Sequence, residues 1–432
     1  MSSTATTRAR EHGGERIVAA LVLALPVLYL ASERTRQVDV WRWSWPWLGG
    51  IVAAAAGYAL WLASYSRALP AALAFVRKLA VVLATSLVVA ALILELVLRA
   101  TTNHAYEELD NRGRHLFDAD VGHVFVPNWT QTLQEHEFRV EWKSNAQGLR
   151  AERDYGAKPE GTKRILIVGD SFTAGEQVAY ADTFPAVVEA RLRETLPNVE
   201  VLNAGHPGYS TANEARWLAK FGAPFAPDLV VVAMTPNDLL ENQFPLQYIA
   251  RDGALVSGNA TDADKARWLD HRGWWSLYGA VERSLLKQRL ENSPAIKRWR
   301  TGSAFTHHRA FQIEQDAKSR ELFALAERYV LEARDAARSF GARFALVTLP
   351  FREQLGALEP NLDGARFGER WRAFGAAQGF PVLDVLPAFA AEPHPEDLYW
   401  RLDSHCTAKG YRLIGETLAA WLAERAEELE LR

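Results

Sequence analysis

Hydrophobic positions follow two different patterns along this chain. Over the first hundred residues they form three long apolar runs, at 17–31, 47–65 and 79–98. After residue 163, short apolar runs alternate with longer amphipathic segments. The first pattern is typical of membrane helices, and the second of a parallel sheet covered by helices on both faces. We therefore expect a membrane anchor followed by an α/β domain.

The second and third apolar runs are long enough to cross about 30 Å of hydrocarbon at about 1.5 Å per residue. The first run is shorter and is similar in length to the core of a signal peptide. No small-residue cleavage site follows it, so we expect it to be retained as a helix. Trp41, Trp43, Trp45 and Trp47 alternate beside the second run, as tryptophans at a membrane interface do. The sequence thus predicts three transmembrane helices within residues 17–99.

The distribution of Lys and Arg predicts the orientation of this anchor. The tail at 1–16 and the loop between the second and third runs together carry six of these residues, whereas the loop between the first and second runs carries three. Because cytoplasmic loops are enriched in basic residues, we expect the tail to lie in the cytoplasm. Three spans would then place the chain after residue 99 on the periplasmic side of the cytoplasmic membrane.

The alternating pattern predicts the elements of the α/β domain, which we expect to span 163–427. Apolar runs indicate strands at 164–169, 199–205, 228–234, 343–350 and 381–386. Amphipathic segments indicate helices at 184–196, 210–222, 316–340, 365–380 and 407–429. Residues 100–162 are expected to form a partly β connector. An aromatic-rich insertion at about 240–313 is expected either to line the substrate site or to pack as helices away from it.

Composition narrows the classes of function. The formal net charge of −3 lacks the basic excess that nucleic-acid binding requires, so we expect no nucleic-acid partner. The single cysteine, Cys406, excludes an intrachain disulfide framework and a multi-cysteine metal site. The connector histidines lack metal-ligand spacing, and no strand is followed by a phosphate-binding or dinucleotide-binding glycine motif. We therefore expect neither a metal nor a cofactor.

Four short polar stretches lie after predicted strands or just before the last helix. They are GDSFT with Ser171, NAGHPGYS with Gly205, TPND with Asn237, and DSHCTAKG with Asp403 and His405. A serine hydroxyl becomes a nucleophile when a histidine takes its proton, and a carboxylate can hold that histidine in the required tautomer. The backbone N–H groups of Ser171 and Gly205 and the side-chain amide of Asn237 are suitable donors to an oxyanion. Together the stretches supply the parts that acyl transfer requires.

In this order the four stretches resemble the SGNH/GDSL hydrolase family, over residues 163–427 without the insertion. The resemblance implies a flavodoxin-like three-layer α/β/α sandwich with a parallel sheet. It also implies that Ser171 is the nucleophile, that His405 and Asp403 complete a triad, and that Gly205 and Asn237 donate to the oxyanion. Two departures stand out. The third stretch has Thr-Pro-Asn where Gly-x-Asn is commoner, and the aspartate precedes the histidine by two residues instead of three.

The D-x-H spacing looks like that of membrane-associated and periplasmic family members that move acetyl groups on polysaccharides, as in alginate O-acetylation. We therefore expect a membrane-anchored serine esterase that acts on O-acyl esters, in particular O-acetyl esters of carbohydrate, with membrane lipid around its N-terminal helices. Three alternatives remain open: an O-acyltransferase of an extracytoplasmic polysaccharide, a non-catalytic module of a glycan-modifying or export complex, and a lipid-directed lipase.

Two further residues lie close to these stretches in the sequence. His206 follows Gly205, and it is interpreted either as a substrate contact or as an exposed loop histidine. Arg352 follows the fourth predicted strand, and it is interpreted either as a site for an anionic glycan or as a solvated or ion-paired side chain.

Overall fold

The computed structural model describes residues 113–134, 137–251, 254–257, 307–401 and 403–432, with isolated helical positions between 75 and 94. The predicted cytoplasmic tail, almost all of the three predicted membrane segments, and residues 258–306 of the predicted insertion lie outside these residues. In the part of the chain that is described, no helix combines the length and the apolar composition that crossing a membrane requires.

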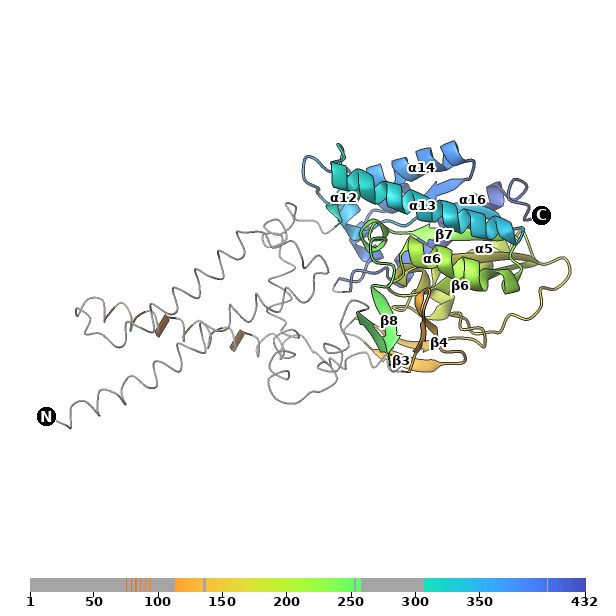
Figure 1. The fold of residues 1–432 in the computed structure, drawn as a ribbon, viewed down its shortest axis with the longest axis horizontal. Coiled ribbons are helices and arrows are strands. Elements are labelled where there is room, and N and C mark those ends of the chain that lie inside the picture. The colour runs from red at the N-terminus through yellow and green to blue at the C-terminus, as the bar shows by residue number, and fades with distance from the viewer. Residues whose placement is uncertain are drawn as a thin grey trace. The chain divides into compact units, whose positions relative to one another are not determined.

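Five parallel strands form the centre of the α/β domain: β5 (Lys163–Gly169), β6 (Val199–Gly205), β7 (Leu229–Met234), β10 (Arg343–Thr348) and β11 (Val382–Asp384). Their order across the sheet is β11-β10-β7-β5-β6. Figure 1 labels β6 and β7 among them. This order is the flavodoxin-like doubly wound one, in which the first and third strands along the chain lie side by side. The expected α/β class with a parallel sheet is confirmed.

Successive side chains of each strand point to opposite faces of the sheet, and each face has its own core. Ile165 and Ile167 of β5 pack against α5 (Phe184–Leu192) and α16 (Ala408–Glu424). Leu166 and Val168 belong to the core that includes α6 (Thr211–Trp217), α13 (Ala317–Ser339) and α14 (Arg366–Gln378). The central strands are continuous apolar runs because both of their faces are covered.

Polar side chains fix where the long helices begin. Asn213 Oδ1 accepts the backbone N–H of Ser210 at 3.1 Å at the start of α6. The side chain of Asp316 accepts the backbone N–H of Ser319 at the start of α13, and that of Thr407 accepts the N–H of Gly410 at the start of α16. These bonds satisfy N–H groups that have no partner within the helix. The short helices are α4 (Ser171–Ala174), α7 (Asp238–Glu241), α12 (His308–Phe311) and α15 (Leu386–Ala390).

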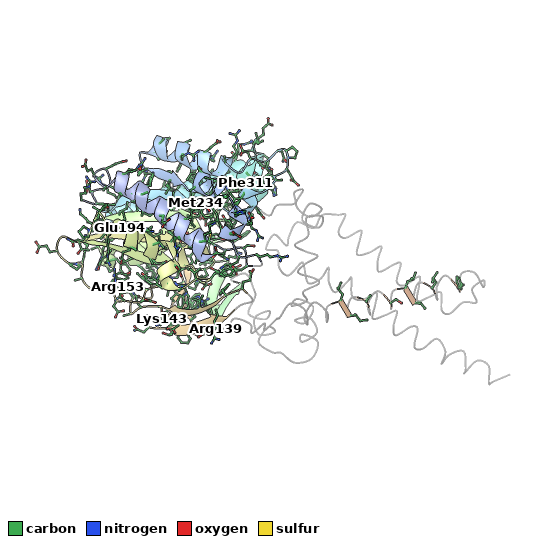
Figure 2. The ribbon with its side chains drawn as sticks, turned by 180° about the vertical axis from the view of Figure 1, so that it is seen from behind. Arg139, Lys143, Arg153, Glu194, Met234 and Phe311 are labelled. Atoms are coloured by element: carbon green, nitrogen blue, oxygen red, sulfur yellow. The ribbon has the colours of Figure 1, made fainter. Side chains whose placement is uncertain are left out.

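Three small antiparallel hairpins accompany the sheet. They pair β1 (His115–Asp118) with β2 (Gly122–Phe125), β3 (Thr130–Gln134) with β4 (Arg139–Lys143), and β8 (Tyr248–Arg251) with β9 (Ala254–Ser257). Arg139 and Lys143 mark the two ends of β4 (Figure 2). The β1–β2 hairpin is tied to the loop after β6, because His123 Nε2 lies 3.0 Å from the carbonyl oxygen of Pro207. The predicted connector therefore packs directly against the α/β domain.

Candidate active site

Ser171 lies at the carboxyl end of β5, where the strand turns into α4. Asp170 precedes it as the N-cap residue, and its side chain accepts the backbone N–H of Phe172 at 2.8 Å. Asp170 also accepts the hydroxyl proton of Thr235, which follows β7, at 2.8 Å. The side chains after β5 and β7 meet at the switch point of the sheet, where doubly wound domains bind their ligands.

The structure brings Ser171 together with the two residues predicted near the C-terminus. Ser171 Oγ lies 2.8 Å from His405 Nε2, and His405 Nδ1 lies 2.7 Å from Asp403 Oδ1. The side chains of His405 and Asp403 are 23% and 27% exposed, so both are mostly covered by the protein. The three groups form a continuous chain of hydrogen bonds from the hydroxyl to the carboxylate, which is the arrangement of a serine nucleophile with its base.

The D-x-H spacing depends on an unusual backbone conformation at Ser404. This residue has a φ of 74°, in the left-handed region that residues other than glycine rarely adopt. The turn brings Asp403 Oδ1 within hydrogen-bonding distance of both Nδ1 and the backbone N–H of His405, at 2.7 and 3.2 Å. A spacing of two residues therefore suffices for a carboxylate–imidazole pair when the residue between them turns in this way.

The charges of the pair perturb both pKa values. Burial of the imidazole lowers the pKa of His405, but the hydrogen bond and the negative charge of Asp403 outweigh it, and the pKa lies above its ordinary value. Burial raises the pKa of the Asp403 carboxyl, but its bonds to His405 outweigh that effect and leave the pKa below its ordinary value. Gln177 also donates a side-chain hydrogen bond to Asp403. An imidazolium at His405 is thus stabilised by an ionised carboxylate.

Gly205 has a different environment from the one expected. Its N–H is donated to Asn203 Oδ1 at 3.0 Å, and a Cβ at this position would lie 2.3 Å from the backbone nitrogen of Ala174. The glycine therefore allows β6 to approach α4, and its N–H already has an acceptor. The expectation that this N–H faces the substrate does not agree with this geometry.

Gly208 offers a second backbone amide in the same stretch. It lies in the loop between β6 and α6 with a φ of 74°, and a Cβ there would lie 2.5 Å from the ring of Tyr248. It is partly exposed, whereas Gly205 is buried. Its N–H makes no backbone hydrogen bond to another of the described residues. The sequence marks this turn, because Pro207 directly precedes Gly208.

Asn237 is held between two carboxylates. Its Nδ2 donates to Glu241 Oε2 at 2.8 Å and lies 3.5 Å from Asp170 Oδ2, while its Oδ1 contacts the hydroxyl of Thr235. The contact with Glu241 uses one N–H of the amide, and the contact with Asp170 is long for a hydrogen bond. The second N–H of Asn237 therefore has only this long contact with Asp170.

A group of acidic side chains lies around Asp170. Asp170, Glu214 and Asp238 are at most 1% exposed, and burial raises the pKa of each. Burial and the charge of Asp170 raise the pKa of Glu241 to about 7. Since close carboxylates in a dry environment cannot all ionise, part of this group stays protonated at neutral pH. Among the described residues, no three acidic, histidine or cysteine side chains are placed to hold a metal ion.

The side chains of His206 and Arg352 both contact other parts of the protein. His206 is 1% exposed, and its ring stacks on Phe125 and Tyr209 at centroid distances of 4.6 Å each. Arg352 donates to the carbonyl oxygens of Trp400 and Arg401, at 3.2 and 2.9 Å. The first is a core residue and the second binds protein backbone.

Comparison with known proteins gives a family match over most of the α/β domain. Residues 167–413 match the GDSL-like lipase/acylhydrolase family. An arylesterase of Vibrio mimicus is 30% identical over 93 residues, which is 22% of this chain and 46% of that protein. The chain thus matches about half of the length of this curated relative.

Two solved structures are similar over most of their own length. TesA is 16% identical, with coverage of 61% of this chain and 99% of TesA and a TM-score of 0.36. A catalytic mutant of the acetylxylan esterase Axe2 of Geobacillus stearothermophilus is 16% identical, with coverage of 62% and 95% and a TM-score of 0.34. Because the family match covers more than half of the 432 residues, this chain belongs to the GDSL-like lipase/acylhydrolase family, the SGNH family of ester hydrolases.

Proposed function

We propose that this protein removes O-acetyl groups from carbohydrate through an acyl-serine intermediate at Ser171. The observation that carries the proposal is the unbroken chain of short hydrogen bonds from Ser171 through His405 to Asp403. The D-x-H spacing supports acetyl esters of carbohydrate, because it resembles that of polysaccharide-modifying members of the family.

In the first step Ser171 Oγ attacks the ester carbonyl carbon while His405 Nε2 takes the hydroxyl proton. The carbonyl oxygen becomes an oxyanion, and the N–H of Ser171, the N–H of Gly208 and the second N–H of Asn237 are the donors we assign to it. Gly208 replaces Gly205 in this assignment, since the Gly205 N–H is donated to Asn203. The carbon–oxygen bond of the ester then breaks, and the His405 imidazolium returns the proton to the leaving sugar hydroxyl.

In the second step water attacks the acetyl-serine. His405 takes a proton from the water, the oxyanion forms again, and the ester bond to Ser171 breaks as the serine oxygen regains that proton. The products are acetate and the free enzyme. Asp403 stays ionised throughout and stabilises the imidazolium, in agreement with its lowered pKa.

Transfer to a sugar hydroxyl is the second candidate function, because the D-x-H spacing also resembles that of acetyl-transferring members. The two activities share the acetyl-serine and differ only in which hydroxyl attacks it. They are separated by giving the solubilised protein an acetyl donor with and without a polysaccharide acceptor. Acetyl groups found on the acceptor indicate transfer, and acetate release that no acceptor reduces indicates hydrolysis.

Labelling of the detergent-solubilised full chain with a fluorophosphonate tests the proposed mechanism. We expect the wild type to be labelled and Ser171→Ala and His405→Ala to be unlabelled, with p-nitrophenyl acetate hydrolysed only by the wild type. A comparison of acetyl with long-chain esters separates a carbohydrate esterase from a lipase. Equal labelling of all three proteins would exclude Ser171 as the nucleophile.

We also propose that three N-terminal helices hold the enzyme in the cytoplasmic membrane with its active site in the periplasm. Support comes from the three apolar segments and from the distribution of Lys and Arg around them. Protease added to intact spheroplasts should cleave the α/β domain. A domain that is cleaved only after lysis would place it on the cytoplasmic side.

A further inference from the structure

Residues 400, 401 and 403–405, called here the 400–405 turn, carry the base of the active site but belong to none of the five parallel strands. Within the segment, the N–H of Trp400 donates to the carbonyl oxygen of His405 at 2.8 Å, and the N–H of Ser404 donates to that of Trp400 at 3.2 Å. The left-handed conformation of Ser404 is one that a serine disfavours in isolation. Groups outside the segment must therefore contribute to holding this turn.

One such group is Glu137, from the turn between β3 and β4. Its Oε1 accepts the backbone N–H of Arg401 at 2.9 Å, and its Oε2 accepts that of Asp403 at 2.9 Å. The ring of the next residue, Phe138, packs against Trp400 with a centroid distance of 5.9 Å. A carboxylate that accepts two backbone N–H groups makes charge-assisted bonds, which are stronger than neutral ones. Both of its oxygens are used on the segment that carries the triad aspartate.

Arg352 binds the oxygen atoms of the same segment, whereas Glu137 binds its N–H groups. Its Nη1 donates to the carbonyl oxygens of Trp400 and Arg401, at 3.2 and 2.9 Å, and its Nη2 lies 3.2 Å from Ser404 Oγ. Glu137 thus accepts from the N–H groups of the segment, and Arg352 donates to its carbonyl and hydroxyl oxygens. The negative charge of Glu137 thus holds the N–H groups of the turn, and the positive charge of Arg352 holds its oxygen atoms.

We propose that Glu137 is a positioning residue for catalysis, which together with Arg352 holds the 400–405 turn so that His405 Nε2 stays within hydrogen-bonding distance of Ser171. The inference rests on the proposed function, since it assigns a role in the same active site. Glu137 acts through the backbone of Asp403 and not on the substrate. Its loss is therefore expected to lower kcat and to leave KM almost unchanged, because the geometry of proton transfer changes while the substrate contacts remain.

Four variants of the full chain test this role: Glu137→Gln, Glu137→Ala, Arg352→Gln and the control Glu141→Gln. Glu137→Gln keeps one acceptor oxygen but places an NH₂ group opposite a backbone N–H. Glu141 lies on the neighbouring strand β4, is 60% exposed and pairs with Lys143. Its replacement changes the same charge in the same hairpin without touching the 400–405 turn.

The first measurement is hydrogen–deuterium exchange of the peptide around 400–405, which does not depend on activity. The second is kcat and KM with p-nitrophenyl acetate, and thermal melting confirms that each variant is folded. We expect faster exchange of this peptide in both Glu137 variants. For Glu137→Ala we expect a loss in kcat of about 10- to 100-fold, since misplacing a catalytic group by about 1 Å costs that much. Glu137→Gln should fall between the alanine variant and the wild type.

The double variant Glu137→Gln/Arg352→Gln distinguishes a shared role from two separate ones. If both residues hold one turn, their effects on kcat should not multiply. Exchange of the 400–405 peptide that stays at the wild-type rate in Glu137→Ala would overturn the proposal, as would an equal loss of kcat in Glu141→Gln. Faster exchange in a protein whose wild type neither turns over ester nor reacts with fluorophosphonate would support the role in holding the turn and overturn only the proposed function.

Discussion

The two halves of the active site are held in place by different means. Ser171 and Asn237 follow β5 and β7, which are neighbouring strands whose register pairs Gly169 with Ala233. Asp403 and His405 lie in a turn held by side chains from distant parts of the chain. Backbone ladders thus fix the nucleophile, and a few charged side chains fix the base. We expect changes in the strand packing behind Ser171 to destabilise the protein, and loss of the charged contacts of the turn to impair catalysis in a folded protein.

The largest effect should come from the catalytic atoms themselves, which join the two halves. Ser171→Ala and His405→Ala should each lower kcat by about 10⁶-fold, and the double variant should be no worse, because each residue needs the other. Their melting temperatures should stay close to that of the wild type. Hydrolysis of p-nitrophenyl acetate is the readout. A double variant markedly less active than either single one would mean that the residues do not act as a unit.

Gly205→Ala tests the strand-bound half. The new methyl group would lie 2.3 Å from the backbone nitrogen of Ala174 and 2.6 Å from the backbone carbon of Thr173, neither of which can move aside easily. We expect a loss in the free energy of unfolding of about 3 kcal/mol. Thermal melting measures this loss. Gly156→Ala is the matched control, because a Cβ at Gly156 meets nothing within 4 Å. Equal melting temperatures for the two variants would contradict the tight packing of β6 on α4.

The pH dependence of stability tests whether His206, in the loop after β6, and His123, in the connector, are held neutral in the folded protein. Burial lowers the pKa of His206 to about 3 and that of His123 to about 4. Well above pH 6.5 both are neutral whether the chain is folded or not. As the pH falls below that value, only the unfolded chain takes up the protons, so stability is lost. From pH 6.5 to 5, His206 should contribute a loss of about 2 kcal/mol.

Glu241 changes stability in the opposite direction, since its pKa is raised to about 7 and it favours the folded state at lower pH. The informative quantity is therefore the difference between wild type and His206→Gln. The variant should lose less stability than the wild type between pH 7 and 5, as measured by denaturant titration at each pH. Parallel pH profiles would mean that His206 is not held neutral in the folded protein.

Substitution of Ser404, in the turn that carries His405, should have the smallest effect on stability. Ser404→Gly relieves the left-handed conformation but adds freedom to the unfolded chain, and these terms of about 1 kcal/mol each should nearly cancel. Ser404→Val should destabilise the protein, since a β-branched side chain disfavours this conformation. Thermal melting of the two variants distinguishes them. A glycine variant less stable than the valine variant would contradict the observed φ.

Much of the fold could be predicted from local patterns. The strand β7 is an uninterrupted apolar run, and β5 contains one at 165–169. Asp316 and Thr407 mark helix starts that the structure places within one residue. Local patterns also locate Ser171, because the serine follows a strand directly. Local patterns do not predict the order of the strands, because the order depends on which strands pair. Here the order was expected from the family resemblance.

The features that sequence analysis missed depend on contacts between distant residues. Glu137 binds the N–H of Asp403 across 266 positions, and no spacing rule connects them. Gly205 and Gly208 belong to the same stretch, and their roles are separated by the hydrogen bond from Gly205 to Asn203 and by the burial of Gly205. The buried ring of His206 could not be distinguished from a loop histidine without the aromatic rings around it.

The contact of Glu137 with the 400–405 turn has a practical consequence for protein engineering. The family match begins at residue 167, and the sheet begins at β5. A truncated enzyme that starts at β5 would keep the nucleophile, the base and all five parallel strands, yet would lack the carboxylate that accepts the N–H of Asp403. A fragment designed for biotechnology should therefore begin upstream of β1 if it is to retain full turnover.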